Sequence, residues 1–220
     1  MVKTFDDILS HLRFGKSFSM SRWGDGEWSC LLGHMGRNCD NHSYDKTLGG
    51  RLKQIVLHNP PYALAIQPKA INEVLSWEIR SFLQEHEVNR EWPNADIIHN
   101  ASIGGRLDEL REVLIDKRVT IVGRPHLAGW LGGKDKEYIV TPPRNCWLNY
   151  AGTLNDCVKS VENGSRIFLF ACGMMANVLI DDLYRIYDGI TLLDVGSVLE
   201  PYVGNCNRRY HQKILERENK

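Results

Sequence analysis

The chain has 220 residues, a length typical of one domain that buries roughly 70% of the surface of its unfolded chain. Lysine plus arginine number 27, as do aspartate plus glutamate, so the net charge is zero, which argues against binding nucleic acid mainly by phosphate neutralisation. No run approaches the roughly 20 apolar residues that span a bilayer and no export signal is apparent, so we expect a cytoplasmic protein whose six cysteines are reduced thiols.

Helical and strand patterns alternate along the sequence. Thr4 and Asp7 predict the start of an amphipathic helix, Gly15 predicts its end, and a strand follows at 18–22. The stretch 33–43 is rich in glycine, asparagine and histidine and predicts a loop. Further strands are predicted at 62–67, 95–99, 119–123, 138–141, 166–172 and 190–195. Further helices are predicted at about 45–57, 70–86, 107–115, 148–161 and 174–187.

These patterns predict the fold class. The apolar run at 167–170 is continuous rather than alternating, which is typical of a strand covered on both faces, and strands interleaved with helices indicate a parallel sheet. The sequence therefore predicts an α/β protein, a single-domain Rossmann-like sandwich with a mostly parallel sheet over residues 1–220. Ligands of such sheets bind outside the carboxyl ends of the strands, so we expect the segments after the strands to gather at one edge. Those segments are 22–27, 123–129, 172–176 and 194–197.

The most informative stretch is Ser-Met-Ser-Arg-Trp-Gly-Asp-Gly-Glu-Trp at 19–28. Asp25 and Glu27 lie at a strand end on a backbone made pliable by Gly24 and Gly26. Two such carboxylates suit a hard divalent cation that keeps open positions for phosphate oxygens, which points to a nucleotide diphosphate. The alternative is a hairpin, because Asp-Gly between apolar residues is a strong type I′ turn signal.

The run from Phe18 to Glu27 resembles the Arg-aromatic-Gly-Asp-Gly-Glu signature of the GT-D-type glycosyltransferases, a bacterial and phage family. Residues 168–179 resemble the strand, Gly-x-x-Ala turn and helix of that family, and 193–200 resemble its late Asp-x-Gly strand end. The segment 141–147 is similar, more loosely, to a Pro-x-x-Asn-aromatic element. Met174 stands where the family pattern leads us to expect proline. The resemblance spans nearly the whole chain and favours the metal-binding motif over the hairpin.

The resemblance implies a metal-dependent glycosyltransferase with a Rossmann-like fold and a UDP-sugar donor. Asp25 and Glu27 would then hold Mn²⁺ or Mg²⁺ against the diphosphate, and Arg22 would add a charge-assisted bond to a phosphate oxygen. If the reaction inverts, Glu200 or Asp194 is the candidate base for the acceptor hydroxyl. Inversion and retention both stay open.

The turn after the strand 166–172 is the expected diphosphate site. Gly173 lets the backbone approach a ligand closely, and the helix that follows, which contains Ala176, would aim its free N–H groups at phosphate. The alternative for Gly173 is a simple strand-to-helix turn. Asp194 either contacts the ligand or caps the next segment or pairs with a basic side chain.

The acceptor stays open among a glycan, a protein-linked glycan and a modified nucleobase in phage DNA, as does a homo-oligomeric state. Two other classes of function also remain. A non-catalytic nucleotide-binding module would share the sheet edge without needing both carboxylates, and a metal-dependent phosphohydrolase would use Asp25 and Glu27 but release inorganic phosphate.

Other patterns carry weaker predictions. A zinc site is conceivable at four side chains whose spacing matches no common finger: Cys30, His34, Cys39 and His42. The run 128–135 lacks the terminal hydroxyl residue of a P-loop, so we reject that motif. Trp23 and Trp28 could stack on a uracil or sugar ring, with core packing favoured for Trp28. The basic segment 207–220 is either a solvated end helix or a flap over the diphosphate.

Overall fold

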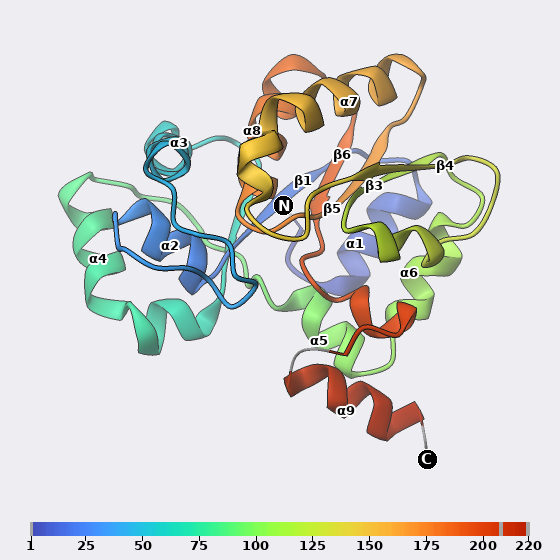
Figure 1. Ribbon diagram of the computed structural model, residues 1–220, viewed down its shortest axis with the longest axis horizontal. Coiled ribbons are helices and arrows are strands. Elements are labelled where there is room, and N and C mark those ends of the chain that lie inside the picture. The colour runs from blue at the N-terminus through green and yellow to red at the C-terminus, as the bar shows by residue number, and fades with distance from the viewer. Residues whose placement is uncertain (1, 207–208, 219–220) are drawn as a thin grey trace.

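The structure, a computed structural model, describes residues 2–206 and 209–218. Its centre is a six-stranded sheet in the order β2-β1-β6-β5-β3-β4, in which every pair of neighbouring strands is parallel (Figure 1). The strands are β1 (Ser19–Trp23), β2 (Ala63–Ile66), β3 (Val119–Gly123), β4 (Lys136–Val140), β5 (Ile167–Ala171) and β6 (Thr191–Asp194). The predicted α/β, Rossmann-like class with a parallel sheet is therefore confirmed.

Helices cover both faces of the sheet. One apolar core lies under α2 (Asp25–Leu31), α3 (Lys46–His58), α4 (Ser76–Glu85), α7 (Tyr150–Glu162) and α8 (Met175–Ile186). The second lies under α1 (Phe5–Arg13), α5 (Ile97–Ile103) and α6 (Leu107–Leu114). The last helix, α9 (Arg209–Glu218), packs against α5 (Figure 1). The described residues also form four short helical turns: η1 (Ala70–Val74), η2 (Pro125–Gly129), η3 (Cys146–Asn149) and η4 (Glu200–Val203).

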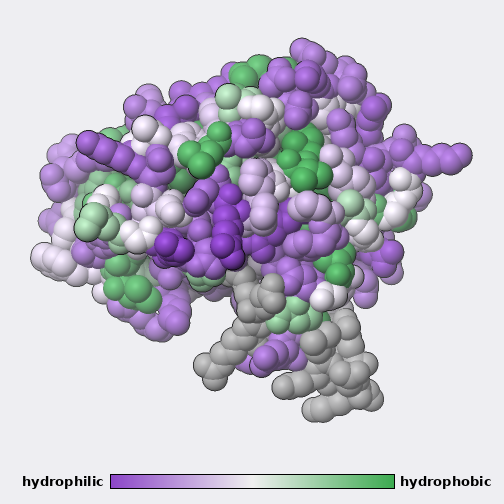
Figure 2. All heavy atoms as spheres, in the orientation of Figure 1, coloured by the Kyte–Doolittle hydropathy of each residue, from purple (hydrophilic) through white to green (hydrophobic). Residues whose placement is uncertain are grey.

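The strand β5 shows why this sequence forms a three-layer sandwich. Phe168 and Phe170 point into one core and Leu169 into the other, and all three side chains are fully buried. Successive side chains of a strand alternate between faces, so a strand with apolar residues at every position needs helices on both sides. Charged and polar residues dominate the molecular surface seen in Figure 2, with isolated apolar residues between them.

The first helix follows its sequence signals closely. The side chain of Thr4 accepts the backbone N–H of Asp7 at 3.1 Å, and the Asp7 carboxylate accepts the N–H of Thr4 at 2.9 Å. This reciprocal capping box satisfies backbone donors that a helix start leaves without partners. Burial of Phe5, Ile8, Leu9 and Leu12 then fixes the helix on the sheet.

Two predicted elements differ from the structure. The predicted strand at 95–99 is wrong, because α5 begins at Ile97 and only an isolated bridge joins Asn94 to Ile66 of β2. Burial of Ile97, Ile98 and Ala101 has the spacing of a helix, which a five-residue window could not distinguish from a strand. The predicted helix at 70–86 is interrupted at Leu75, where φ is −122°, so η1 and α4 are separate.

Candidate active site

The carboxyl ends of the six strands meet at a cavity of about 240 Å³. Its lining takes at least one residue from the segment directly after every strand: Gly24, Gln67, Arg124, Thr141, Cys172 and Gly196. Parallel strands all end at the same edge, so loops far apart in the sequence come together there. The structure brings most of the predicted site residues to this cavity, namely Arg22, Gly24, Asp25, Gly26, Glu27, Gly173, Asp194 and Glu200.

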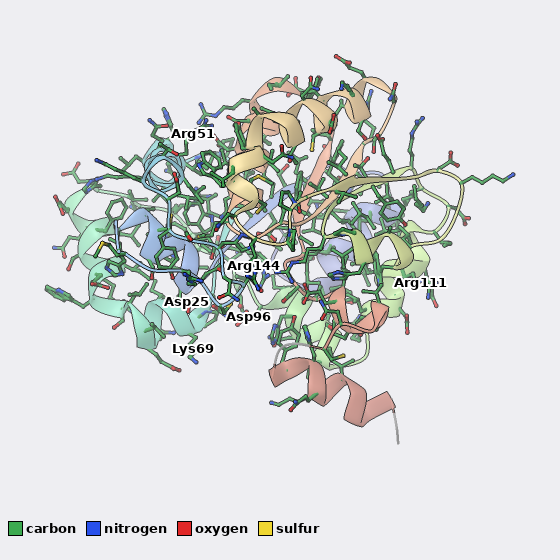
Figure 3. The ribbon with its side chains drawn as sticks, viewed as in Figure 1. Asp25, Arg51, Lys69, Asp96, Arg111 and Arg144 are labelled. Carbon is green, nitrogen blue, oxygen red and sulfur yellow. The ribbon has the colours of Figure 1, made fainter. Side chains whose placement is uncertain are left out.

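The stretch containing Asp25 and Glu27 forms the first turn of α2 rather than a hairpin, so the turn alternative is wrong. Gly24 is the N-cap, and its N–H donates to Oε2 of Glu27 at 2.9 Å. Oδ1 of Asp25 accepts the N–H of Gly26 at 3.0 Å, and the Asp25 side chain is exposed, as Figure 3 shows at the start of α2. Carboxylates are favourable in a first helical turn because the helix dipole is positive there.

Glu27 is half-buried, and its protonation follows from that burial. Burial, with a smaller contribution from the neighbouring Asp194, raises the pKa of Glu27 to about 7, against the lowering effects of the Gly24 N–H and of Arg22. Burial also raises the pKa of Asp194, against the lowering effect of Arg22. The carboxyls of Glu27 and Asp194 and the guanidinium of Arg22 therefore influence one another's charge, and a cation bound beside them would favour the ionised form of both acids.

Asp194 joins the ends of two strands. Its Oδ2 accepts the backbone N–H of Arg22 at 3.2 Å, and its Oδ1 accepts the N–H of Gly196 at 2.9 Å. Asp194 therefore caps the segment after β6, which was one of its predicted roles. It also lines the cavity.

Arg22 extends from β1 into the cavity and is held from several sides. Its Nε donates to the carbonyl of Ala95 at 2.9 Å, and its Nη2 lies 3.9 Å from Oδ1 of Asp96. Gly196 has a φ of +56°, and a Cβ at that position would lie 2.0 Å from Nη1 of Arg22. Glycine is therefore needed at 196 both for the backbone conformation and for the close approach of the guanidinium.

A second arginine, Arg124, was not singled out from the sequence. It follows β3 directly, donates from Nη1 to Oε1 of Glu200 at 3.1 Å, and places Nη2 3.8 Å from Oδ1 of Asp40. His126 lies 3.9 Å from the same Glu200 oxygen. Glu200 is buried, so the candidate base is embedded in a charged group rather than standing alone. Arg124 could have been found from the sequence, because it directly follows a predicted strand.

The turn after β5 differs in detail from the prediction. Gly173 has a φ of +61°, and a Cβ there would lie 3.2 Å from the ring of His42, a buried side chain that also lines the cavity. The glycine thus permits close packing with a protein side chain as well as the turn. Ala176 is fully buried in the core under α8 and does not line the cavity, so its predicted ligand contact is wrong.

The aromatic side chains that line the cavity are not the two tryptophans considered from the sequence. Trp23 and Trp28 are fully buried against each other, with ring centroids 5.7 Å apart, so neither offers a face to a ligand. Instead His99 of α5 and Tyr210 of α9 line the cavity with ring centroids 4.1 Å apart. Part of the predicted basic segment 207–220 thus forms α9, while residues 207, 208, 219 and 220 lie outside the described residues.

The four side chains of the conceivable zinc site do not come together. His34 pairs with Glu78, the thiol of Cys30 donates to the carbonyl of Asp45, and Cys39 is exposed. Across the described ranges, no group of three or more His, Cys, Asp or Glu side chains is placed to hold a metal. Asp25 and Glu27 still suit Mg²⁺ or Mn²⁺, since such ions use one or two protein carboxylates and take their other ligands from phosphate and water.

The parallel α/β sheet, with a polar cavity at the carboxyl ends of its strands, defines a Rossmann-like fold. Its fold is shared with a structure described as a new glycosyltransferase, domain of unknown function 1792, from Streptococcus sanguinis, with a TM-score of 0.66 and 21% identity over 92% of this chain and 84% of that one. It is also shared with two structures of domain of unknown function 1792, one described as having a distinct glycosyltransferase fold, each with a TM-score of 0.65 and 21% identity over 91% of this chain and 80% of that one.

A scan of protein-family models and a search of curated proteins found no match. The resemblance inferred from the motifs is confirmed as a shared fold, which is the glycosyltransferase fold of domain of unknown function 1792. Within residues 2–206 and 209–218, no helix is long and apolar enough to cross a membrane.

Proposed function

We propose that the protein is a glycosyltransferase that moves a sugar from a nucleotide diphosphate sugar, a UDP-sugar, to an acceptor hydroxyl. One observation carries the proposal: Asp25, Glu27 and Arg22 line a single polar cavity at the sheet edge. The fold in which they do so is that of a protein described as a glycosyltransferase. The acceptor classes remain a glycan, a protein-linked glycan and a modified nucleobase.

Asp25 and Glu27 are the side chains that would hold Mn²⁺ or Mg²⁺. The exposed Asp25 carboxylate is accessible from solvent, and Glu27 lies two residues along the same helical turn. A bound divalent cation supplies positive charge next to the diphosphate, which neutralises the charge that develops on the leaving nucleotide. The two carboxylates fit this role because their oxygens are hard ligands.

Arg22 is the phosphate-binding group in this proposal. Its hydrogen bond to Ala95 and its contact over Gly196 fix the guanidinium before a ligand arrives. Fixing a charged donor in advance removes part of the entropy that binding would otherwise cost. Asp194 supports this arrangement by holding the backbone of Arg22, which makes it a positioning residue.

Proton removal from the acceptor falls to Glu200 in an inverting reaction. Glu200 lines the cavity, and Arg124 lies within hydrogen-bond distance of its carboxylate. Asp194, whose two oxygens accept the N–H groups of Arg22 and Gly196, is the second candidate.

The test is a screen of nucleotide sugars for hydrolysis in the presence of Mn²⁺ or Mg²⁺ and without an acceptor. A glycosyltransferase releases free sugar and UDP slowly, and chelation with EDTA stops the release. Release of inorganic phosphate would instead identify a phosphohydrolase. Binding of UDP without turnover of any donor would identify a nucleotide-binding module.

A further inference from the structure

An open cavity of about 530 Å³ lies at the amino ends of β2, β1 and β6, which are neighbours in the sheet. The polar cavity described above lies at the carboxyl ends, so the two cavities occupy opposite edges of the parallel sheet. Residues at or just before the strand starts line the new cavity: Ser17, Phe18, Ser19, Pro61, Tyr62 and Ile190. We refer to it as the amino-edge cavity.

Aromatic rings line the amino-edge cavity on both faces of the sheet. On the face under α1, His11 and Phe18 meet edge to face with ring centroids 5.4 Å apart. On the face under α8, the rings of Tyr62 and Tyr184 have centroids 5.0 Å apart, and Tyr187 lies directly after the helix. Aromatic rings in a small-molecule site offer apolar faces against which a ring of the ligand packs.

The side chain of Ser19 lies on the same face as the tyrosines. Side chains alternate along β1, and Phe18 and Met20 pack into the core under α1, so Ser19 points to the face under α8. Ser19 is 6% exposed and lines the cavity, and its Oγ has no hydrogen-bond partner among the described residues. A buried hydroxyl without a partner costs stability, which a ligand hydroxyl placed against it would recover.

The phenol groups at this wall add further hydroxyls. The hydroxyl of Tyr62 donates to Oδ1 of Asp181 at 3.2 Å, so this side chain is fixed by the fold. Tyr184 and Tyr187 are half-buried, and within residues 2–206 and 209–218 no hydrogen bond joins their hydroxyls to another group. A hydroxyl both donates and accepts, so such a wall matches a ligand that carries hydroxyls of its own.

The charge of the amino-edge cavity favours a neutral ligand. None of its described lining residues is lysine or arginine, and Asp188 contributes a carboxylate. A phosphate placed there would lose its hydration without gaining a cationic partner. The diphosphate of a nucleotide sugar fits the polar cavity instead, because Arg22 and Arg124 line that one.

We propose that the amino-edge cavity binds a neutral saccharide, whose ring packs against Tyr184 and Tyr187 and whose hydroxyls meet Ser19 and the phenol groups. A sugar ring combines apolar C–H faces with several hydroxyls, which is the combination that these walls complement. The volume lies within the roughly 300–1,000 Å³ of small-molecule sites. The site holds its saccharide without reacting with it, because Asp25 and Glu27 lie at the opposite edge.

Binding is tested by NMR of the protein labelled with ¹³C in the rings of its eight tyrosines, with signals assigned from single Tyr→Phe variants. The probes are glucose, galactose, N-acetylglucosamine and their disaccharides, with choline as a cation and UDP as an anion. We expect a saccharide to shift the signals of Tyr184 and Tyr187 but not that of Tyr44, which lines neither cavity. The proposal is overturned if no saccharide shifts these two signals, or if choline or UDP alone does.

Two variants test the position of the saccharide. Ser17→Trp fills the cavity from an exposed position, so folding should be preserved, and we expect binding about tenfold weaker. Ser10→Trp, exposed on α1 and outside the lining, is the matched control and should bind as the wild type does. Ser19→Ala removes a hydroxyl without a partner in the fold, so its melting temperature should not fall while binding weakens about tenfold. Wild-type affinity in both Ser17→Trp and Ser19→Ala would contradict the assignment.

This inference does not rest on the proposed function, and donor hydrolysis separates the two. Ser17→Trp should hydrolyse a nucleotide sugar as the wild type does, since the polar cavity is unchanged. Hydrolysis without saccharide shifts at Tyr184 and Tyr187 would refute the amino-edge site and leave the glycosyltransferase intact. Shifts at these tyrosines without hydrolysis of any donor would refute the function and leave the saccharide site.

Discussion

Replacing Glu27 with glutamine should change how the stability of the metal-free protein depends on pH. Burial raises the pKa of Glu27 to about 7 in the folded protein, against 4.5 in an unfolded chain. The folded state thus holds the proton more tightly. The corresponding stability is fully present below pH 4.5 and is lost as the pH rises through about 7, which amounts to about 3 kcal/mol.

The assay is urea unfolding of wild type and Glu27→Gln between about pH 4 and pH 8, with EDTA present. Glutamine cannot ionise, so the free energy of unfolding of the variant should rise relative to wild type by about 3 kcal/mol across this range. Glu85→Gln, an exposed position on α4, is the matched control. The difference in unfolding free energy between wild type and Glu27→Gln could instead stay constant with pH, or Glu85→Gln could show the same pH dependence. Either result would refute the inference that burial raises the pKa of Glu27.

The affinity for a metal ion should also depend on the protonation state of Glu27. Binding a cation needs the ionised carboxylate, so the affinity for Mn²⁺ should fall by about tenfold for each pH unit below 7. We also expect Glu27→Gln to affect stability more than a substitution in an exposed loop would, because Oε2 of Glu27 accepts the N–H of Gly24.

Three further substitutions test the cavity. Gly196→Ala puts a methyl group 2.0 Å from Nη1 of Arg22, so calorimetry should show UDP binding weakened by about tenfold, whereas Gly189→Ala, also at positive φ but in open space, should bind UDP normally. Arg22→Ala should weaken UDP binding more than uridine binding, since only UDP carries phosphate, and equal losses in calorimetric titrations would contradict this. Asp25→Asn should lower donor turnover by about a hundredfold or more in the hydrolysis assay with little change in melting temperature, because Asp25 is exposed; a lower melting temperature with normal turnover would make Asp25 a structural residue.

The sequence was sufficient for the class of fold but not for its arrangement. Continuous apolar runs such as 167–170 indicate strands covered on both faces, and that inference holds for β5. The strand order β2-β1-β6-β5-β3-β4 depends on which buried strands pair, and apolar runs of similar composition carry no such information. The short run at 95–99 fits both the two-residue repeat of a strand and the 3.6-residue repeat of a helix, so the helix there was missed.

The candidate site could be predicted where it follows from strand ends. Arg22, Asp25 and Asp194 lie at or just after the ends of predicted strands, and parallel topology brings them together. His42 could not be found in this way, because it lies in the loop 33–43, whose path is set by tertiary contacts such as the packing on Gly173. Ala176 was misplaced because a Gly-x-x-Ala pattern does not say which side of a helix faces the core.

Hydrolysis of the donor in water enriched with ¹⁸O tests the central proposal most directly. A glycosyltransferase breaks the bond between the anomeric carbon and the diphosphate oxygen, so the label should appear in the released sugar and be absent from UDP. Mn²⁺ should be required, and Asp25→Asn should lower the labelled product by about a hundredfold or more. Label in inorganic phosphate or in the nucleotide, or full formation of labelled sugar in excess EDTA, would contradict a metal-dependent glycosyltransferase.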